Sequence, residues 1–159
     1  MAPSSSRNVL RDGLDLVART SSLLLHASET LTVISEALER TAGLVGAGQI
    51  ALYENTDAPS GEVVCLRQGG WSAPGMPVLP DMIPLRSIAT DDPFFGSIRD
   101  VLTAGNPFQA ATSALPAKLR ELAEYHHVRS LALVPVLVQG SLWGELVATC
   151  TVEPACWDD

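Results

Sequence analysis

The three cysteines are the first residues whose chemistry could define a site. Cys65, Cys150 and Cys156 are odd in number, and none of them forms a C-x-x-C pair. Structural zinc sites need several closely spaced thiols, and a disulfide framework needs an even number of cysteines. The pattern therefore argues against both and predicts reduced thiols, with Cys65 as a small core residue in a strand-like segment.

The side chains that could catalyse a reaction lack the surroundings that catalysis requires. Ser60 and Ser141 do not lie in a G-x-S-x-G elbow, and no glycine-rich loop that could hold a phosphate precedes a helix. Asp91 and Asp92 are adjacent carboxylates, but Asp92 stands before Pro93, where it can cap a helix. Since no nucleophile, base and oxyanion site occur together, we predict that the chain is not an enzyme.

Composition places the chain among globular domains. Its 159 residues suit one domain, 47% of them are hydrophobic, and the net charge is −8. Lys and Arg do not cluster, which argues against nucleic-acid binding. The longest apolar runs are too short to span a bilayer, and the N-terminal "MAPSSSRNV" has no signal-peptide core. We therefore expect a cytoplasmic protein without a membrane segment.

Two helices are predicted near the N-terminus, after a disordered tail over residues 1–7. The first helix covers 8–28 and has a seam of residues spaced four and three apart, which are Leu10, Leu14, Val17, Ser21 and Leu24. This seam fits either packing on the chain's own domain or a dimer interface. The second helix covers 30–47 and ends at Gly46 and Gly48. We assign residues 8–159 to a single domain.

The rest of the chain alternates pairs of strands with a pair of helices. Strands are predicted over 49–54, 62–68 and 83–87, and the proline- and glycine-rich segment 69–82 is predicted to be a surface excursion. Helices are predicted over 91–105, which ends at Gly105, and over 115–127. Two apolar strands, 128–138 and 141–150, are joined by a tight turn at Gln139-Gly140.

This order of elements predicts an α+β fold. Strands joined by short turns pair antiparallel, so we expect a central antiparallel sheet of five to six strands with helices on both faces, in α-β-α layers. The strand 128–138 is apolar at both alternating positions, which predicts cover on both of its faces. We place the hairpin 128–150 at the centre of this sheet.

The final segment "VRSLALVPVLVQGSLWGELVATCTVEPACW" resembles the GAF domain, in particular its phytochrome and cyanobacteriochrome branch. The matching positions are Val128, Arg129, Leu133, Val134, Pro135, Leu142, Trp143, Gly144, Cys150 and Trp157. The order of elements matches over roughly residues 20–159. The resemblance implies a cytoplasmic sensor module, commonly dimeric, that binds a small ligand between the sheet and a lid formed by the middle segments. It also implies a linked output domain such as a histidine kinase or cyclase.

Departures from the family patterns restrict the cofactor. A bilin-attaching member would carry a Cys-His pair about ten residues ahead of Val128, where this chain has Lys118 and Leu119. The resemblance therefore implies no covalent bilin. The N-K…F…D-E signature of cyclic-nucleotide-binding members is missing, and the cysteines do not match the cluster of methionine sulfoxide reductases. The cofactor stays unknown.

A pair of histidines leaves haem as an alternative cofactor, which we consider the weaker one. Haem-binding members place an axial histidine just before the R-x-x-L strand, and His126 and His127 lie in that neighbourhood. A neutral imidazole can ligate iron from a pocket wall. Adjacent histidines at a helix end can instead face solvent and interact with free carbonyl groups there.

The candidate ligand-binding residues come from the predicted lid and from the strand after it. They are Trp71, Phe94, Phe95, Arg99, Phe108, Tyr125, His126 and Leu133. Aromatic side chains can line an apolar pocket, and Arg99 could hold an anionic ligand. The same aromatic residues could equally fill the core themselves. No metal ligands and no catalytic residues are predicted.

Two functions follow from these observations. The first is a sensor that binds an unidentified small molecule noncovalently, as a homodimer linked to an output domain that this chain lacks. The second is a dimerisation module without a ligand, with residues 8–28 at its interface. The two are compatible because a sensor transmits its signal through some interface.

Overall fold

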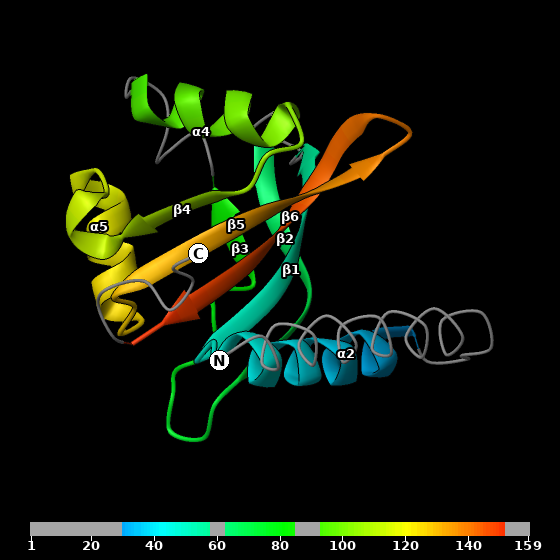
Figure 1. The fold of residues 1–159 in the computed structure, drawn as a ribbon, viewed down its shortest axis with the longest axis vertical. Coiled ribbons are helices and arrows are strands. Elements are labelled where there is room, and N and C mark those ends of the chain that lie inside the picture. Colours follow the sequence, from blue (N-terminus) through cyan, green and yellow to red (C-terminus); the bar gives the residue numbers. More distant parts are fainter. Residues whose placement is uncertain (1–29, 58–62, 85–92, 152–159) are drawn as a thin grey trace, which may run out of the picture.

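The fold is a six-stranded antiparallel sheet with helices on both faces, as the sequence predicts (Figure 1). The structure is a computed structural model that describes residues 30–57, 63–84 and 93–151. The predicted tail, the helix over 8–28 and its seam lie outside the described residues. The strands lie in the order β3-β2-β1-β6-β5-β4. Their bounds are β1 Gln49–Asp57, β2 Val63–Ser72, β3 Met82–Pro84, β4 Phe108–Ala111, β5 Ser130–Val138 and β6 Ser141–Cys150.

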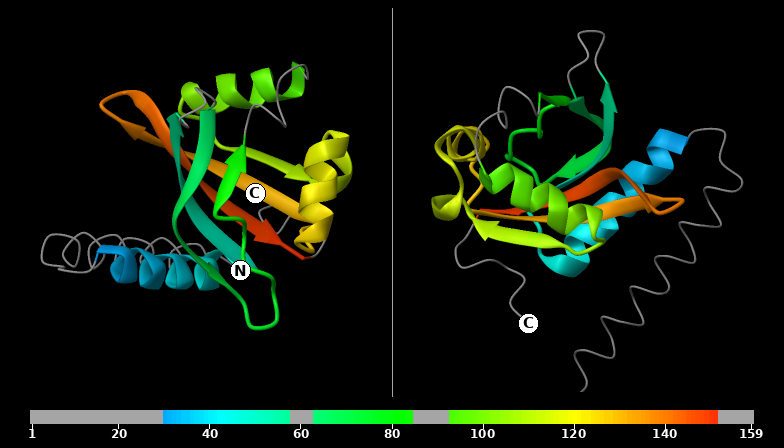
Figure 2. Two further views of the ribbon diagram at one scale, coloured as in Figure 1. Left: turned by 180° about the vertical axis from the view of Figure 1, so that it is seen from behind. Right: turned by 90° about the horizontal axis from the view of Figure 1, so that it is seen from above.

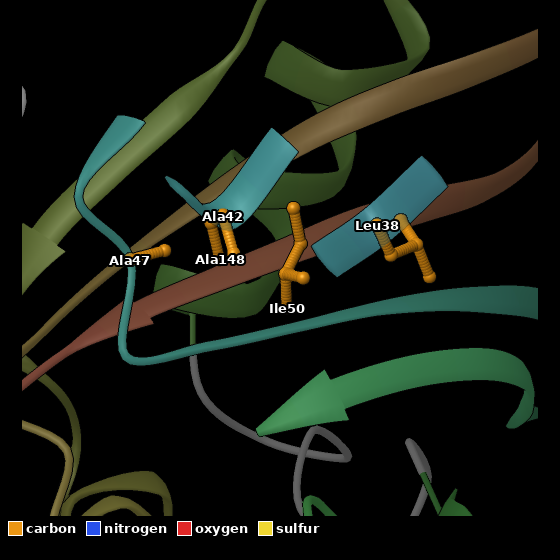
Figure 3. Packing of buried hydrophobic residues seen from close by; sticks show 5 residues of the cluster. All are labelled: Leu38, Ala42, Ala47, Ile50 and Ala148. Carbon is orange, nitrogen blue, oxygen red and sulfur yellow. The ribbon is translucent and has the colours of Figure 1, made fainter. Parts of the chain in front are cut away.

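Helix α2, Thr30–Val45, covers one face of the sheet (Figures 1 and 2). Its apolar stripe packs Leu38 and Ala42 against Ile50 of β1 and Ala148 of β6 (Figure 3). Gly46 follows with a φ of 70°, which allows the left-handed end that the sequence predicts. Because side chains alternate along a strand, the neighbours Ala51 and Val147 point to the other face.

The opposite face is bordered by α4, Pro93–Thr103, and α5, Ala117–Tyr125. Helix α4 lies across the sheet from α2, and α5 lies beside β4 (Figure 2). Pro93 opens α4 as predicted, and Gly105 follows it with a φ of 81°. The short 3-10 helix Thr112–Ala114 connects β4 to α5. Leu115, Ala123 and Val128 form the buried cluster that anchors this end.

The hairpin of β5 and β6 is confirmed, but its place in the sheet differs from the prediction. Gln139 and Gly140 both have positive φ angles, which is the geometry of a two-residue turn that matches strand twist. Strand β6 lies at the centre, next to β1, whereas β5 lies between β6 and the edge strand β4. Since α2 packs mainly over β1 and β2, Val134 of β5 remains 43% exposed, and Leu137 and Val138 beside the turn are 43% and 49% exposed. Complete cover of this strand was therefore a wrong prediction.

Two glycines lie in a strand where the sequence predicts a surface loop. Strand β2 continues to Ser72 through Gly69 and Gly70. A Cβ atom at Gly69 would lie 2.7 Å from Cγ2 of Ile34 in α2. Glycine is therefore required here for close helix–sheet packing rather than for a turn. Strand β4 was also missed, because four residues at a sheet edge give too short a pattern to identify.

The cysteines differ in their chemistry. Cys65 is a buried free thiol, as predicted. Cys150 takes part in a disulfide, so the prediction of a reduced thiol is wrong at this position. An odd number of cysteines excludes a fully paired framework, but it does not exclude a single pair.

Candidate functional site: a cavity between the sheet and helices α4 and α5

A cavity of about 880 Å³ lies on the face of the sheet opposite α2. Its floor is formed by inward-facing residues of β1, β5 and β6, and its walls by α4, α5 and the segment around Leu79 and Pro80. Most of the wall is apolar, with Leu102, Leu119 and Leu131 among its residues. Its size is within the range of small-molecule sites, which are also mostly apolar.

A polar cluster interrupts the apolar floor. Glu145 of β6 is 8% exposed and lines the cavity. Its Oε2 accepts a hydrogen bond from Nδ2 of Asn55 at 3.0 Å, and its Oε1 accepts one from Sγ of Cys65 at 3.0 Å. The Cys65 thiol also lies 3.2 Å from Oδ1 of Asn55. Because a thiol has a single proton, the two oxygens share it.

Burial sets the protonation of this cluster. It raises the pKa of Glu145, while the hydrogen bonds from Cys65 and Asn55 act in the opposite direction. It also raises the pKa of the Cys65 thiol, and the nearby charge of Glu145 and the hydrogen bond to it add to this effect. The thiol is therefore protonated at neutral pH, and the carboxyl holds its proton to a higher pH than an exposed glutamate does.

Tyr53 connects the sheet to the cavity wall around Pro80 through a hydrogen bond. This residue of β1 is fully buried, and its hydroxyl donates a hydrogen bond of 2.7 Å to the carbonyl oxygen of Pro80. Gln49 of the same strand donates from its side-chain amide to the carbonyl oxygen of Pro77. The segment between β2 and β3 is thus held at the cavity by two side chains of β1, although it forms no regular element.

His126 lies at another part of the wall, at the end of α5. It is 8% exposed, and its Nδ1 is buried without a hydrogen-bond partner. Burial lowers its pKa, with a smaller contribution from His127, so the imidazole is neutral near pH 7. The structure therefore buries His126 against the cavity, whereas His127 is exposed and has a φ of 58°. The expectation that both histidines face solvent is wrong for His126.

The predicted site residues fall into three groups. Arg99, Phe108, His126 and Leu133 all line the cavity. Trp71 instead packs on the opposite face with the α2 cluster, where it pairs with Ile50, and Tyr125 is 76% exposed. Phe94 and Phe95 belong to α4, but their side chains lie outside the described residues.

Sequence reasoning missed the polar cluster altogether. Glu145 carried a signal, because it is the one charged residue in the otherwise uncharged strand 141–150. Its neighbours Leu146 and Ala148 face α2, so the alternation along β6 turns Glu145 to the cavity. Asn55 and Cys65 could not be linked to it from the sequence, because strand pairing brings them together across 90 and 80 positions of the chain.

Neither a metal site nor a membrane segment is visible in the part of the chain that the structure describes. Over 30–57, 63–84 and 93–151, no three His, Cys, Asp or Glu side chains are grouped so that they could hold a metal ion. No helix in these ranges is both long enough and apolar enough to cross a membrane.

The GAF domain family model matches residues 29–159, which is most of the chain and includes every element described above. The chain belongs to the GAF family. GAF domains are signalling modules of the sensor type. No curated protein matches this GAF domain in sequence.

Solved structures of other GAF domains share its fold. A phycoerythrobilin-bound GAF domain from a cyanobacterial phytochrome is 13% identical, with a TM-score of 0.70 over 91% of this chain and 84% of that one. A phycocyanobilin-bound GAF domain, also from a cyanobacterial phytochrome, is 16% identical, with a TM-score of 0.68 over 97% and 84%. The PixJ GAF domain of Thermosynechococcus elongatus is 17% identical, with a TM-score of 0.63 over 92% and 77%.

Proposed function

We propose that this GAF domain senses a small molecule, which it binds noncovalently in the cavity between the sheet and helices α4 and α5. The observation that carries the proposal is the cavity of about 880 Å³, with apolar walls and a polar cluster in its floor. Similar GAF structures hold bilins, which supports a ligand in this family. We further propose that the domain acts as a homodimer within a signalling protein such as a histidine kinase or cyclase.

We propose noncovalent binding because the free thiol that lines the cavity, that of Cys65, is not suited to attach a ligand. Helix α5 has Lys118 and Leu119 where the family resemblance places the attachment cysteine. The free thiol at the cavity is that of Cys65, which lies on β2 and is hydrogen bonded to Glu145. Burial raises its pKa, so the nucleophilic thiolate does not form near neutral pH.

Binding is also favoured over catalysis by the state of the other groups in the cavity. Glu145 makes its hydrogen bonds to Asn55 and Cys65, and the Tyr53 hydroxyl donates to Pro80. These groups thus support the cavity wall and do not form a nucleophile with an adjacent base.

A change that fills the cavity tests the proposal. We expect Val147→Phe to remove the stabilisation that a ligand gives, because Val147 lines the cavity from the centre of the sheet. The matched control is Leu146→Phe, since Leu146 is the next residue of β6 and packs on the α2 face. Both variants and the wild type would be screened by thermal shift against a metabolite library and by native mass spectrometry for copurified ligand.

The expected result is a ligand-induced rise in Tm for the wild type and for Leu146→Phe, and a loss of that rise for Val147→Phe. At a ligand concentration 100 times Kd, the stabilisation would be about 2.7 kcal/mol. A folded wild type that neither copurifies with a ligand nor responds to any compound would contradict a ligand-binding function. A rise that Val147→Phe retains would place the ligand outside the cavity.

Haem is a second candidate ligand, favoured by the unpartnered Nδ1 of His126 at the cavity wall. The imidazole is neutral near pH 7, which is the form that ligates iron. When bound, haem would supply redox or gas-binding chemistry. Protein purified with haem should show a Soret band that His126→Ala abolishes, and protein without such a band would exclude this candidate.

A further inference from the structure

Glu145 is the one carboxylate among the cavity-lining residues of the described chain. It is 8% exposed, and the carboxyl lies at the floor among apolar neighbours from the same sheet face, such as Val147 and Tyr53. A buried carboxylate is costly unless an opposite charge and hydrogen bonds compensate it. Its surroundings therefore indicate what a ligand must supply.

The described residues supply hydrogen bonds to Glu145 but no opposite charge. Its two oxygens accept from the neutral groups of Asn55 and Cys65. Within the described residues Glu145 makes no ion pair, and no cation contributes to its pKa. Arg99 also lines the cavity, but it is an exposed residue of α4. Since a carboxylate offers about four lone-pair positions, two remain for a ligand.

We propose that the cavity selects an organic cation with an apolar body, and that an N–H group of this ligand donates to the carboxylate of Glu145. This inference rests on the proposed ligand-binding function. The apolar walls fit the body of the ligand, and the ammonium or amidinium group supplies the charge that the floor lacks. A charge-assisted hydrogen bond contributes more than a neutral one.

The proton balance of this step is defined by the groups around the cavity. Burial raises the pKa of Glu145 and so favours its neutral form, while the hydrogen bonds from Cys65 and Asn55 favour the carboxylate. An ammonium ligand pairs with the carboxylate, so any molecule in which Glu145 is protonated releases that proton to solvent on binding. Tyr53 and Cys65 keep their protons, since burial raises the pKa of both, and His126 stays neutral.

Three fluorescent probes of one shape but different charge test the selection. They are 1-pyrenemethylamine, 1-pyrenemethanol and 1-pyrenecarboxylate, which are cationic, neutral and anionic near pH 7. We expect the amine to bind the wild type roughly tenfold more tightly than the alcohol, as one charge-assisted hydrogen bond would give. The carboxylate should bind most weakly. Calorimetry of the amine in buffers of different ionisation enthalpy should show proton release that increases as the pH is lowered and more of the carboxyl is protonated.

Two isosteric substitutions separate the effect of an ion pair with Glu145 from the effect of the protein's net charge on binding. Glu145→Gln should reduce the preference for the amine to about equality with the alcohol, because the amide cannot form the ion pair. Glu121→Gln makes the same change in net charge at an exposed position of α5 outside the cavity and should leave the preference unchanged. Proton release is measured on the wild type, so the test does not depend on the folding of Glu145→Gln.

The outcomes distinguish this inference from the proposed function. Equal binding of amine and alcohol, or tightest binding of the anion, would overturn cation selection while leaving a ligand-binding cavity in place. A preference for the amine that survives in Glu145→Gln would also overturn it. If none of the three probes binds the folded wild type, both the inference and the binding function are contradicted.

Discussion

The most informative residue of this domain is Glu145, a buried carboxyl that no cation of the described segments pairs with. Glu145 occupies an inward position of a central strand, where an apolar residue would pack with Val147 and stabilise the sheet. Its hydrogen bonds to Asn55 and Cys65 satisfy the oxygens without neutralising the charge. Such a residue stabilises the fold less than an apolar one would, and its presence at a cavity points to binding.

The raised pKa of Glu145 predicts how stability depends on pH. Because the folded state holds the proton more tightly than the unfolded state, the stabilising contribution is complete below the ordinary value of 4.5. It is lost as pH rises from there through the higher pKa of the folded state, by at most about 1.4 kcal/mol per pH unit. Urea unfolding across this range should therefore show that wild type loses stability relative to Glu145→Gln.

Comparison of the two proteins removes the contribution of His126, which has the opposite sign. Its lowered pKa means that stability is lost as pH falls below the ordinary value of 6.5, and this loss is common to both proteins. A stability difference between wild type and Glu145→Gln that stays constant with pH would show that burial does not perturb this carboxyl.

At the scale of elements, the glycine of the L-W-G motif fixes the distance between the two central strands. A Cβ atom at Gly144 of β6 would collide with the backbone carbonyl of Tyr53 in β1. Backbone atoms cannot rotate away as a side chain can, so the strands would have to separate. The glycine therefore supports the pairing that brings Glu145 beside Asn55.

Gly144→Ala should destabilise the domain by about 1–3 kcal/mol through overpacking. The matched control is Gly43→Ala in α2, where nothing lies within 4 Å of the added methyl group. That control should be neutral or stabilising by up to about 1 kcal/mol, because alanine favours a helix. The free energies of unfolding of both variants check this pair, and an unchanged stability of Gly144→Ala would contradict the close approach of β1 and β6.

The same scale shows where sequence patterns fail. Gly69 and Gly70 are typical of a turn, but both lie in β2, and α2 approaches closely at Gly69. Trp71 follows them and was expected in the lid, yet strand alternation turns it to the α2 face. The two-residue alternation of side chains along a strand shows which residues share a face of the sheet. It does not show which of the two faces borders a cavity.

At the scale of the whole molecule, the layers of helices and sheet could be predicted from hydrophobic periodicity and turn residues in the sequence. The cavity could not be predicted in this way. The Gln139-Gly140 turn, the end of α2 at Gly46 and the start of α4 at Pro93 are local signals, and all three are confirmed. The order of the strands depends on pairings between distant segments, so the central place of β6 and the edge strand β4 could not be derived. The polar cluster depends on the same distant pairings.

The two faces of the sheet differ, as those of a ligand sensor must. The α2 face is filled by the cluster of Leu38, Ala42, Ile50 and Ala148 (Figure 3), whereas the cavity lies on the opposite face. Helices α4 and α5 border that cavity, so a ligand would contact both the sheet and the helices that cover it. Occupancy can therefore bias the position of these helices.

Amide chemical shifts recorded by NMR during titration with 1-pyrenemethanol test this claim most directly. We predict that the perturbed residues gather around the cavity, at Leu119, His126, Leu131, Leu133 and Val147, and that Leu38, Ala42 and Ala148 on the α2 face stay unchanged. Perturbations confined to the α2 face, or none at concentrations that saturate the probe's solubility, would contradict it.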